Sequence, residues 1–293
     1  MKSSYFITAI GTPMNADETL CEKGLEQELA DQKAKGYEGI LVAGSMGCMQ
    51  LLKDETYRKL IERAVKLFDG EIMVGAGDCG FARTAARIEY INNFKVDGVA
   101  VLAPFFWKLS QGELVDYYKA LADVSKAPLY LYDLPQVTGT KLSMDTCLEL
   151  AKHPNIAGAK LSGPLDFSRH LNDAVGDKFR VIIANPDLLD MTIKYGIHNQ
   201  LDGIWVITAG WTREIRLAAE KGDWARAAVY VRKMITVRDL LGKYGWASFT
   251  DMMNARGIEG YFVGKPFKRL DAARKDALLN EPIMKELVAE DHI

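Results

Sequence analysis

Two side chains of this sequence, a lysine and a tyrosine, could together form and break down an imine. Lys160 stands between Ala159 and Leu161 at the end of an apolar run, where an ammonium group is costly unless it is paired, neutral or bonded. Burial disfavours the charged form of an amine, and a neutral amine can attack a ketone to form a Schiff base. Tyr132 ends the preceding apolar run, and a phenol beside such an amine can relay protons. The alternatives are a lysine that extends to the surface and a tyrosine that only fills the core.

A turn rich in glycine supplies a third component, a site for an anion. Gly44, Ser45 and Met46 precede Gly47 between an apolar run and an amphipathic stretch. A hydroxyl group and unpaired backbone N–H groups at such a turn can hold a carboxylate, although most turns of this composition are only turns. Together the amine, the phenol and the turn suit a 2-oxo acid, with its carboxylate in the turn and its ketone at Lys160.

These residues lie at the ends of apolar runs that alternate with amphipathic stretches along most of the chain. We expect strands at residues 5–10, 39–43, 72–75, 98–102, 128–132, 156–160, 180–184 and 203–207. We expect helices at residues 22–35, 55–68, 83–94, 111–124, 143–153, 166–175, 186–195 and 212–221. The strands are continuous apolar runs, which is typical of parallel strands covered on both faces.

Eight strand–helix units predict an α/β fold, a (β/α)8 TIM barrel, whose active site lies at the carboxyl ends of the strands. A doubly wound open sheet is the alternative, but the segment after the first strand, GTPMNAD, is no dinucleotide-binding motif. Further helices are expected at 223–244, 247–258 and 267–290. We therefore expect a catalytic barrel over residues 1–222 and a helical extension over 223–293 that packs on it.

Composition excludes several other classes of function. The 293 residues carry 37 Lys and Arg against 39 Asp and Glu, so no basic excess favours nucleic acid as a partner. No apolar run approaches the roughly 18 residues that span a membrane, and residues 1–13 lack the features of a signal peptide. A cytoplasmic protein is expected. The four Cys and four His residues show no metal-ligand spacing, so no metal is expected.

Three segments resemble motifs of the dihydrodipicolinate synthase / N-acetylneuraminate lyase family of class I, Schiff-base, pyruvate-dependent aldolases. They are GSMGC at 44–48, YDLPQVTG at 132–139 and GAKLS at 158–162, and the similarity covers the whole chain. The resemblance implies a homotetramer (a dimer of dimers) with no redox cofactor and no catalytic metal. It implies that Lys160 forms the imine, that Tyr132 is the acid/base, and that Ser45 with nearby amides binds the carboxylate.

Four departures from the family pattern bear on the reaction. Met46 replaces the second hydroxyl of the turn, and Cys48 replaces a glutamate. Val137 stands where the synthase branch has an arginine that binds the aldehyde substrate's carboxylate. Phe106 stands where that branch has a tyrosine of its proton relay. These losses argue against a lysine-biosynthetic synthase and for a 2-oxo acid lyase or dehydratase.

Several other residues are candidates for substrate contacts. Asp133 could accept hydrogen bonds from substrate hydroxyls, although a turn or capping carboxylate is the favoured interpretation. Phe106 lies in an aromatic stretch that lines either the mouth of the barrel or a subunit interface. Thr138, in the second motif, and Val206, on the expected eighth strand, complete the set. Cys48 is interpreted as a small space-filling residue rather than a nucleophile.

The predicted function is a class I lyase that makes or breaks a carbon–carbon bond of a 2-oxo acid, with pyruvate as one partner. A 2-keto-3-deoxy sugar acid is the expected class of substrate. The alternatives are dihydrodipicolinate synthase (4-hydroxy-tetrahydrodipicolinate synthase), a 2-keto-3-deoxy acid dehydratase, and a non-catalytic sensor of 2-oxo acids. No covalent or redox cofactor is expected beyond the imine at Lys160.

Overall fold

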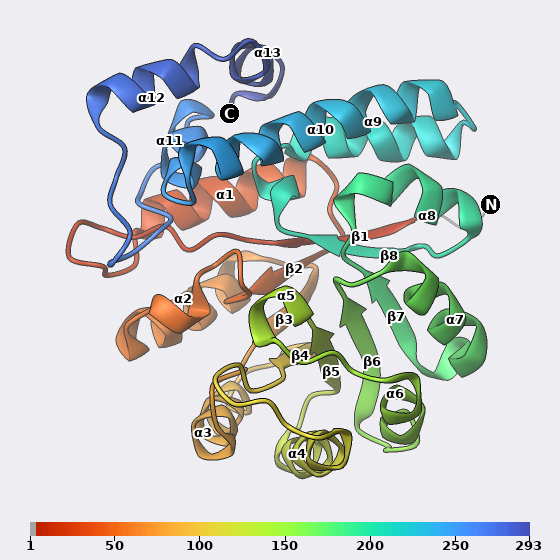
Figure 1. Ribbon diagram of the computed structural model, residues 1–293. Coiled ribbons are helices and arrows are strands. Elements are labelled where there is room, and N and C mark those ends of the chain that lie inside the picture. Colours follow the sequence, from red (N-terminus) through yellow and green to blue (C-terminus); the bar gives the residue numbers. More distant parts are fainter. Residues whose placement is uncertain (1–3) are drawn as a thin grey trace.

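A closed barrel of parallel strands, β1 to β8 in chain order, forms the centre of the computed structural model, which describes residues 4–293 (Figure 1). The strands are β1 Tyr5–Ala9, β2 Gly39–Val42, β3 Glu71–Gly75, β4 Gly98–Leu102, β5 Leu129–Asp133, β6 Ile156–Leu161, β7 Arg180–Ile183 and β8 Asn199–Asp202. The predicted TIM barrel is therefore confirmed, and the carboxyl ends of all these strands meet at one face.

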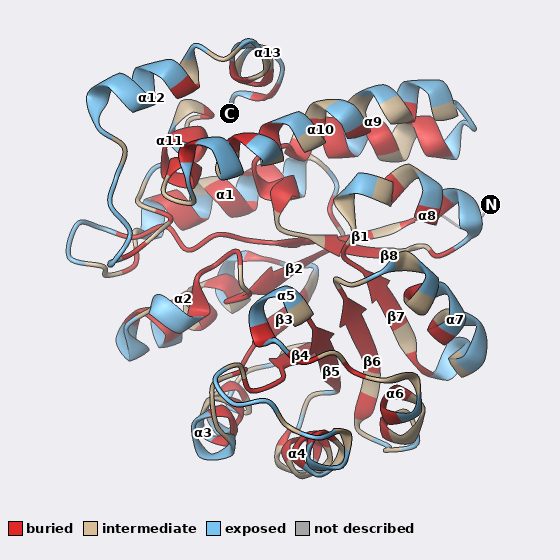
Figure 2. Ribbon diagram, in the orientation of Figure 1, coloured by how far each residue is buried: buried red, intermediate tan, exposed pale blue. Residues whose placement is uncertain are grey.

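Helices alternate with the strands and cover the outside of the barrel. They are α1 Glu22–Ala34, α2 Asp54–Leu67, α3 Phe81–Ile91, α4 Gln111–Val124, α6 Met144–Leu150, α7 Leu165–Val175, α8 Leu189–Tyr195 and α9 Ala209–Glu220. Shorter helical segments lie in the loops: Met49–Leu51, α5 Pro135–Thr138, Gly176–Lys178, Pro186–Leu188 and Ile204–Val206. Figure 2 shows the strands largely buried and the outward faces of the helices exposed. Burial on both faces explains why the strands lack polar alternation.

The eighth strand differs from the prediction. The expected strand at residues 203–207 is a short helical segment, and β8 is the more polar stretch Asn199–Asp202 just before it, which pairs with β1. Asp202 ends the strand because its Oδ1 accepts a hydrogen bond from the Ile204 amide at 2.9 Å. The apolar run that follows is buried for another reason: Trp205 stacks on Phe6, with ring centroids 5.0 Å apart.

The C-terminal residues form four helices after the barrel: α10 Trp224–Tyr244, α11 Ser248–Ala255, α12 Ala272–Leu279 and α13 Pro282–Asp291. The expected helix at 267–290 is therefore wrong as one element, because it divides before Pro282, whose ring suits a first helical position. The expected boundary between residues 222 and 223 falls in the segment between α9 and α10. Helix α10 runs beside α9 (Figure 1). This packing brings the carboxyl-terminal part of α10 toward the carboxyl ends of the strands.

A buried ion network ties the end of the chain to α1. Arg256 is fully buried, and its Nη2 lies 2.8 Å from Asp31 Oδ2 and 3.3 Å from Asp291 Oδ2. Its Nη1 donates to the Val206 carbonyl at 2.7 Å. Asp291 also pairs with Lys35 and accepts from the Gly210 amide at the start of α9. These contacts fix the C-terminal helices against the barrel.

Candidate active site

The carboxyl ends of the strands surround a cavity of ≈ 470 Å³. Its ionisable lining side chains are Tyr132, Lys160, Asp202 and Arg238. The remaining lining residues are Ala9, Ser45, Met46, Leu134, Val137, Ser162, Ala184, Gly203, Ile204, Leu241, Trp246 and Phe267. The cavity thus contains the amine, the phenol and the turn that the sequence singles out.

Lys160 points into this cavity from β6 and is not tied to an acid. Its residue pairs with Tyr132 of β5 in the parallel register, and only 4% of it is exposed. Its Nζ lies 3.8 Å from the centroid of the Tyr132 ring. Within residues 4–293, the ion pairs use other lysines, such as Lys141 with Asp133, and not Lys160. A buried amine without a carboxylate partner is available to a substrate carbonyl.

The phenol of Tyr132 connects the amine to the turn. Tyr132 Oη and Ser45 Oγ are hydrogen-bonded at 3.2 Å. Among the described residues, the Ser45 and Met46 amides donate no hydrogen bond to the protein. The turn is tightly held, because the Thr12 hydroxyl donates to the Gly47 carbonyl at 2.7 Å. Two unpaired amides and a hydroxyl on a rigid turn can bind a carboxylate.

Met46 occupies space beside that turn rather than adding a hydrogen bond. It is 7% exposed, and a Cβ atom placed on Gly203 would lie only 2.8 Å from the Met46 Cβ. The thioether therefore fits because residue 203 has no side chain. This close contact narrows the cavity on the side of β8.

Asp202, Ser162 and Arg238 are lining residues that the sequence analysis did not single out. Burial raises the pKa of the Asp202 carboxyl, while the charge of Lys160 and the amides of Ile204 and Gly203 oppose that rise. Ser162 follows Lys160 by two positions, so strand alternation could have indicated that it faces the same side. Arg238 comes from α10, and no strand-end pattern could have indicated it.

Five of the residues predicted to bind substrate do not line the cavity. Asp133 is 2% exposed; its Oδ1 accepts from the Leu142 amide at 3.1 Å, and its Oδ2 pairs with Lys141. This is the capping arrangement that the sequence analysis favoured. Thr138 donates to the carbonyls of Thr140 and Leu134, at 2.9 and 3.2 Å.

The other three lie farther from the predicted role. Phe106 is 75% exposed and packs edge-on against Trp107, so it forms no part of the cavity wall. Val206 is fully buried, and Ile204 lines the cavity in its place. Gly44 packs closely on the Leu41 side chain, because a Cβ atom at residue 44 would lie only 3.0 Å from Leu41 Cδ2. Their contacts with substrate remain predictions.

Cys48 lies behind the turn and not in the cavity. It is 5% exposed, and its Sγ accepts a hydrogen bond from Trp246 Nε1 at 3.4 Å. Burial raises the pKa of this thiol, with the Trp246 hydrogen bond opposing the rise. A protonated, enclosed thiol is a poor nucleophile, and its packing against Trp246 supports the space-filling role.

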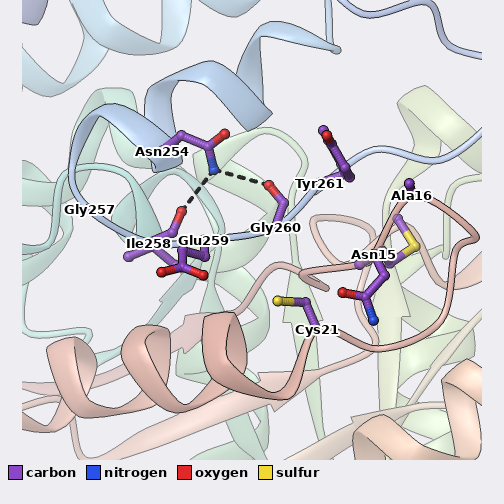
Figure 3. A pocket seen from close by; sticks show the side chains of 10 residues that line it. Asn15, Ala16, Cys21, Asn254, Gly257, Ile258, Glu259, Gly260 and Tyr261 are labelled. Carbon is purple, nitrogen blue, oxygen red and sulfur yellow. Dashed lines mark hydrogen bonds between the residues drawn. The ribbon is translucent and has the colours of Figure 1, made fainter.

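A second hollow, of ≈ 510 Å³, lies between the loop after β1 and the segment after α11 (Figure 3). Asn254, in the last turn of α11, donates to the carbonyls of Ile258 and Gly260 at 2.8 and 3.0 Å and so holds the following segment to its helix. The acidic group in its wall, Glu259, already pairs with Lys23. Its described lining residues contain no amine or histidine, so they offer no group that could form an imine.

The described residues also bear on two other classes of site. Residues 4–293 contain no group of three or more His, Cys, Asp or Glu side chains that could hold a metal ion. No helix in this part of the chain is both long and apolar enough to cross a membrane.

Comparison with known sequences assigns nearly all of the chain to one family. A model of the Dihydrodipicolinate synthetase family matches residues 2–280. The 4-hydroxy-tetrahydrodipicolinate synthases of Exiguobacterium sibiricum and Stenotrophomonas maltophilia are 32% and 36% identical to it. Those matches cover 61% and 62% of this chain but only 62% and 58% of those proteins, less than two thirds of their length. The Methanosphaera stadtmanae synthase is 27% identical over 97% of both chains.

Solved structures share the fold over nearly the entire chain. A dihydrodipicolinate synthetase-like protein from Pseudomonas aeruginosa is 20% identical, with a TM-score of 0.88 over 97% of this chain and 99% of that one. A prophage protein from E. coli K12, in complex with pyruvate, is 22% identical, with a TM-score of 0.87 over 98% and 99%. A variant of the Sulfolobus solfataricus 2-keto-3-deoxygluconate aldolase is 19% identical, with a TM-score of 0.89 over 97% and 96%.

Proposed function

The chain belongs to the dihydrodipicolinate synthetase family of class I, pyruvate-dependent aldolases, and from that premise we propose that it is a Schiff-base lyase. It cleaves a 4-hydroxy-2-oxo acid into pyruvate and an aldehyde, or joins the two in reverse. A 2-keto-3-deoxy sugar acid, the substrate class expected from the sequence, has this reactive unit. The expected homotetramer and cytoplasmic location belong to the same proposal.

The observation that carries the proposal is the placement of Lys160. Its amine is buried over the Tyr132 ring without an ion-pair partner in the described chain. The Tyr132 hydroxyl is hydrogen-bonded to Ser45, and Ser45 lies on the turn whose amides are unpaired. An amine, a proton carrier and a carboxylate site are therefore adjacent in one cavity, as an imine-forming enzyme requires.

In the proposed reaction, Lys160 attacks the ketone carbon while Ser45 and the Ser45 and Met46 amides hold the carboxylate. The carbinolamine loses water to give a protonated imine, which withdraws electrons from the neighbouring carbons. Tyr132 donates its proton to the departing hydroxyl of the carbinolamine. The resulting phenolate accepts the proton of the C4 hydroxyl as the C3–C4 bond breaks, and an aldehyde leaves. The resulting enamine takes this proton from Tyr132 at C3. Addition of water to the imine returns a proton to Tyr132, and hydrolysis releases pyruvate and regenerates the amine.

The synthase branch fits this cavity less well. Val137 lines the cavity where that branch has an arginine, so no cation from this position can bind the carboxylate of an aldehyde substrate. Phe106 has no hydroxyl and stands outside the cavity wall. Dehydration of a 2-keto-3-deoxy acid remains the closest alternative, because it would use the same imine.

Trapping with borohydride in the presence of pyruvate tests the proposal. We expect a reduced pyruvate adduct on the peptide that contains Lys160, and none in Lys160→Ala. Lys141 is an internal control because it also lies over an aromatic ring, Phe167 at 3.6 Å, but is paired with Asp133. Equal labelling of Lys141 and Lys160 would contradict a special role for Lys160. Absence of an adduct when pyruvate raises the melting temperature would contradict the proposal and favour a sensor.

A further inference from the structure

The cavity has two halves of different chemical character. Ser45, Tyr132 and Lys160, at or next to the strand ends, define the half that would hold pyruvate. Beyond the strand ends, the other half is formed by segments that follow β5 and by the C-terminal residues. Its apolar lining side chains are Leu134, Val137, Leu241, Trp246 and Phe267.

The one guanidinium in the described cavity lining, that of Arg238, is already neutralised. Its Nη1 pairs closely with Asp187, and its Nη2 lies 2.9 Å from Asp239 Oδ1. Two carboxylates therefore surround one cation, so this part of the rim is not positive overall. A carboxylate at the far end of a substrate would have to displace Asp187 or accept repulsion from both acids.

A chain of hydroxyl groups would also find few partners in this half. Ser162 supplies one hydroxyl near Lys160, and apart from the paired Arg238 the side chains that line the distal half are aliphatic or aromatic. Moving a hydroxyl from water to such a wall without a hydrogen-bond partner costs free energy. Burying an alkyl chain or an aromatic ring against the same wall is favourable.

We propose that the aldehyde partner of this enzyme is uncharged and has an apolar body, such as an alkyl chain or an aromatic ring. This inference rests on the proposed function. It keeps the reactive 4-hydroxy-2-oxo acid unit and replaces the hydroxylated distal group of the expected sugar acid with an apolar one. In the synthetic direction, C3 of the enamine at Lys160 bonds to the aldehyde carbon, whose oxygen takes a proton from Tyr132. Hydrolysis of the imine then releases a 4-hydroxy-2-oxo acid.

The test compares aldehydes in pairs that differ in one property. 4-Carboxybenzaldehyde and its methyl ester differ in charge, and glyceraldehyde and propanal differ in hydroxyl groups. Each is supplied with pyruvate, and formation of the 4-hydroxy-2-oxo acid is measured. Because even a small misfit in an apolar pocket changes kcat/KM by roughly 10–200-fold, we expect each apolar member to exceed its partner at least about 10-fold. A polar member that equals or exceeds its partner overturns the proposal.

Two variants test the structural reason. Val137→Arg places a cation on the apolar wall, so we expect kcat/KM for 4-carboxybenzaldehyde to rise about 10-fold relative to its ester. Val229→Arg is the matched control, because Val229 is also exposed but lies on α10 outside the cavity. Asp187→Asn releases one partner of Arg238 and should shift the preference the same way. An unchanged preference in both Val137→Arg and Asp187→Asn would overturn the argument from charge.

A separate readout distinguishes failure of this inference from failure of the proposed function. Exchange of the C3 hydrogens of pyruvate in D2O requires the imine at Lys160 but no aldehyde. Exchange without use of any of the four aldehydes overturns the inference on the acceptor and leaves the imine chemistry in place. Absence of exchange, together with absence of a borohydride adduct, overturns the proposed function itself.

Discussion

Replacement of Tyr132 by phenylalanine separates proton transfer from the placement of the amine. The ring that lies 3.8 Å below Lys160 Nζ stays, and only the oxygen 3.2 Å from Ser45 Oγ is removed. The lost neutral hydrogen bond is worth about 0.5–1.5 kcal/mol of stability. Lys160 should therefore remain in position, and pyruvate should still form an imine.

The chemical steps should suffer far more than the fold. A positioned acid/base contributes about 10²–10⁴-fold to a rate. At about 1.4 kcal/mol for each factor of ten, Tyr132→Phe should raise the barrier by roughly 3–5 kcal/mol. This loss is several times the cost in stability, so the two effects can be told apart.

Three measurements check this prediction: the amount of pyruvate adduct trapped at equilibrium, the rate of C3 exchange in D2O, and the free energy of unfolding in urea. Tyr130→Phe is the matched control, because Tyr130 is a buried tyrosine two residues earlier on β5 that interacts with Arg180 instead. We expect Tyr130→Phe to keep its exchange rate. If the rate of C3 exchange in Tyr132→Phe stays within about threefold of that of the unmodified protein, the phenol does not contribute 10²-fold or more to proton transfer. Another group would then carry the proton.

Three further predictions concern binding and stability. Met46→Thr supplies the missing hydroxyl to the turn. A hydrogen bond to a charged group is worth about 1.5 kcal/mol or more, so the KM for pyruvate should fall about 10-fold. An unchanged KM would place the carboxylate of pyruvate elsewhere. Arg256→Met leaves Asp31 and Asp291 buried without their cation and should lower the free energy of unfolding in urea by about 3–5 kcal/mol. Part of this stability should return at low pH, where the carboxylates take up protons. A loss below about 1 kcal/mol would contradict the role of the network. Burial raises the pKa of Glu28 from 4.5 to about 8, so the folded state binds more protons than the unfolded state between these values. Stability should therefore fall as the pH rises from about 4.5 to 8, and Glu28→Gln should flatten this dependence; parallel pH profiles of the two proteins would refute the assignment.

Most of the barrel could be predicted because its strands obey one simple rule. A parallel strand covered on both faces is a continuous apolar run, and β1 to β7 follow it to within a residue or two at each end. The eighth strand breaks the rule, because Asn199 and Gln200 lie in β8 while the more apolar run after Asp202 packs against other segments. An apolar run indicates that a segment is buried but not that it is a strand. Residues 204–207 are buried by packing against other segments rather than by pairing in the sheet.

The predicted site divides in the same way. Lys160 and Tyr132 could be brought together from the sequence because neighbouring parallel strands place their ends side by side, and the register pairs these two residues directly. Asp133, one residue after Tyr132, points away because side chains alternate along a strand, and its carboxylate caps the segment at Leu142. Strand alternation therefore decides which of two adjacent polar residues can reach the cavity.

The distal half of the cavity could not be predicted, because long-range packing creates it. Arg238 and Leu241 lie in the carboxyl-terminal part of α10 and Trp246 lies just beyond it, and nearly eighty residues separate Lys160 from Arg238 along the chain. They reach the cavity because α10 lies along α9 and its own end approaches the segment Pro186–Leu188. The two halves therefore depend on different parts of the chain. The barrel strands supply the groups that would form the imine, whereas the C-terminal helices supply much of the wall that an aldehyde would meet. Substitutions at Arg238 or Leu241 should accordingly change the preference for the aldehyde while pyruvate exchange continues. The paired aldehydes measure the first effect and exchange in D2O measures the second.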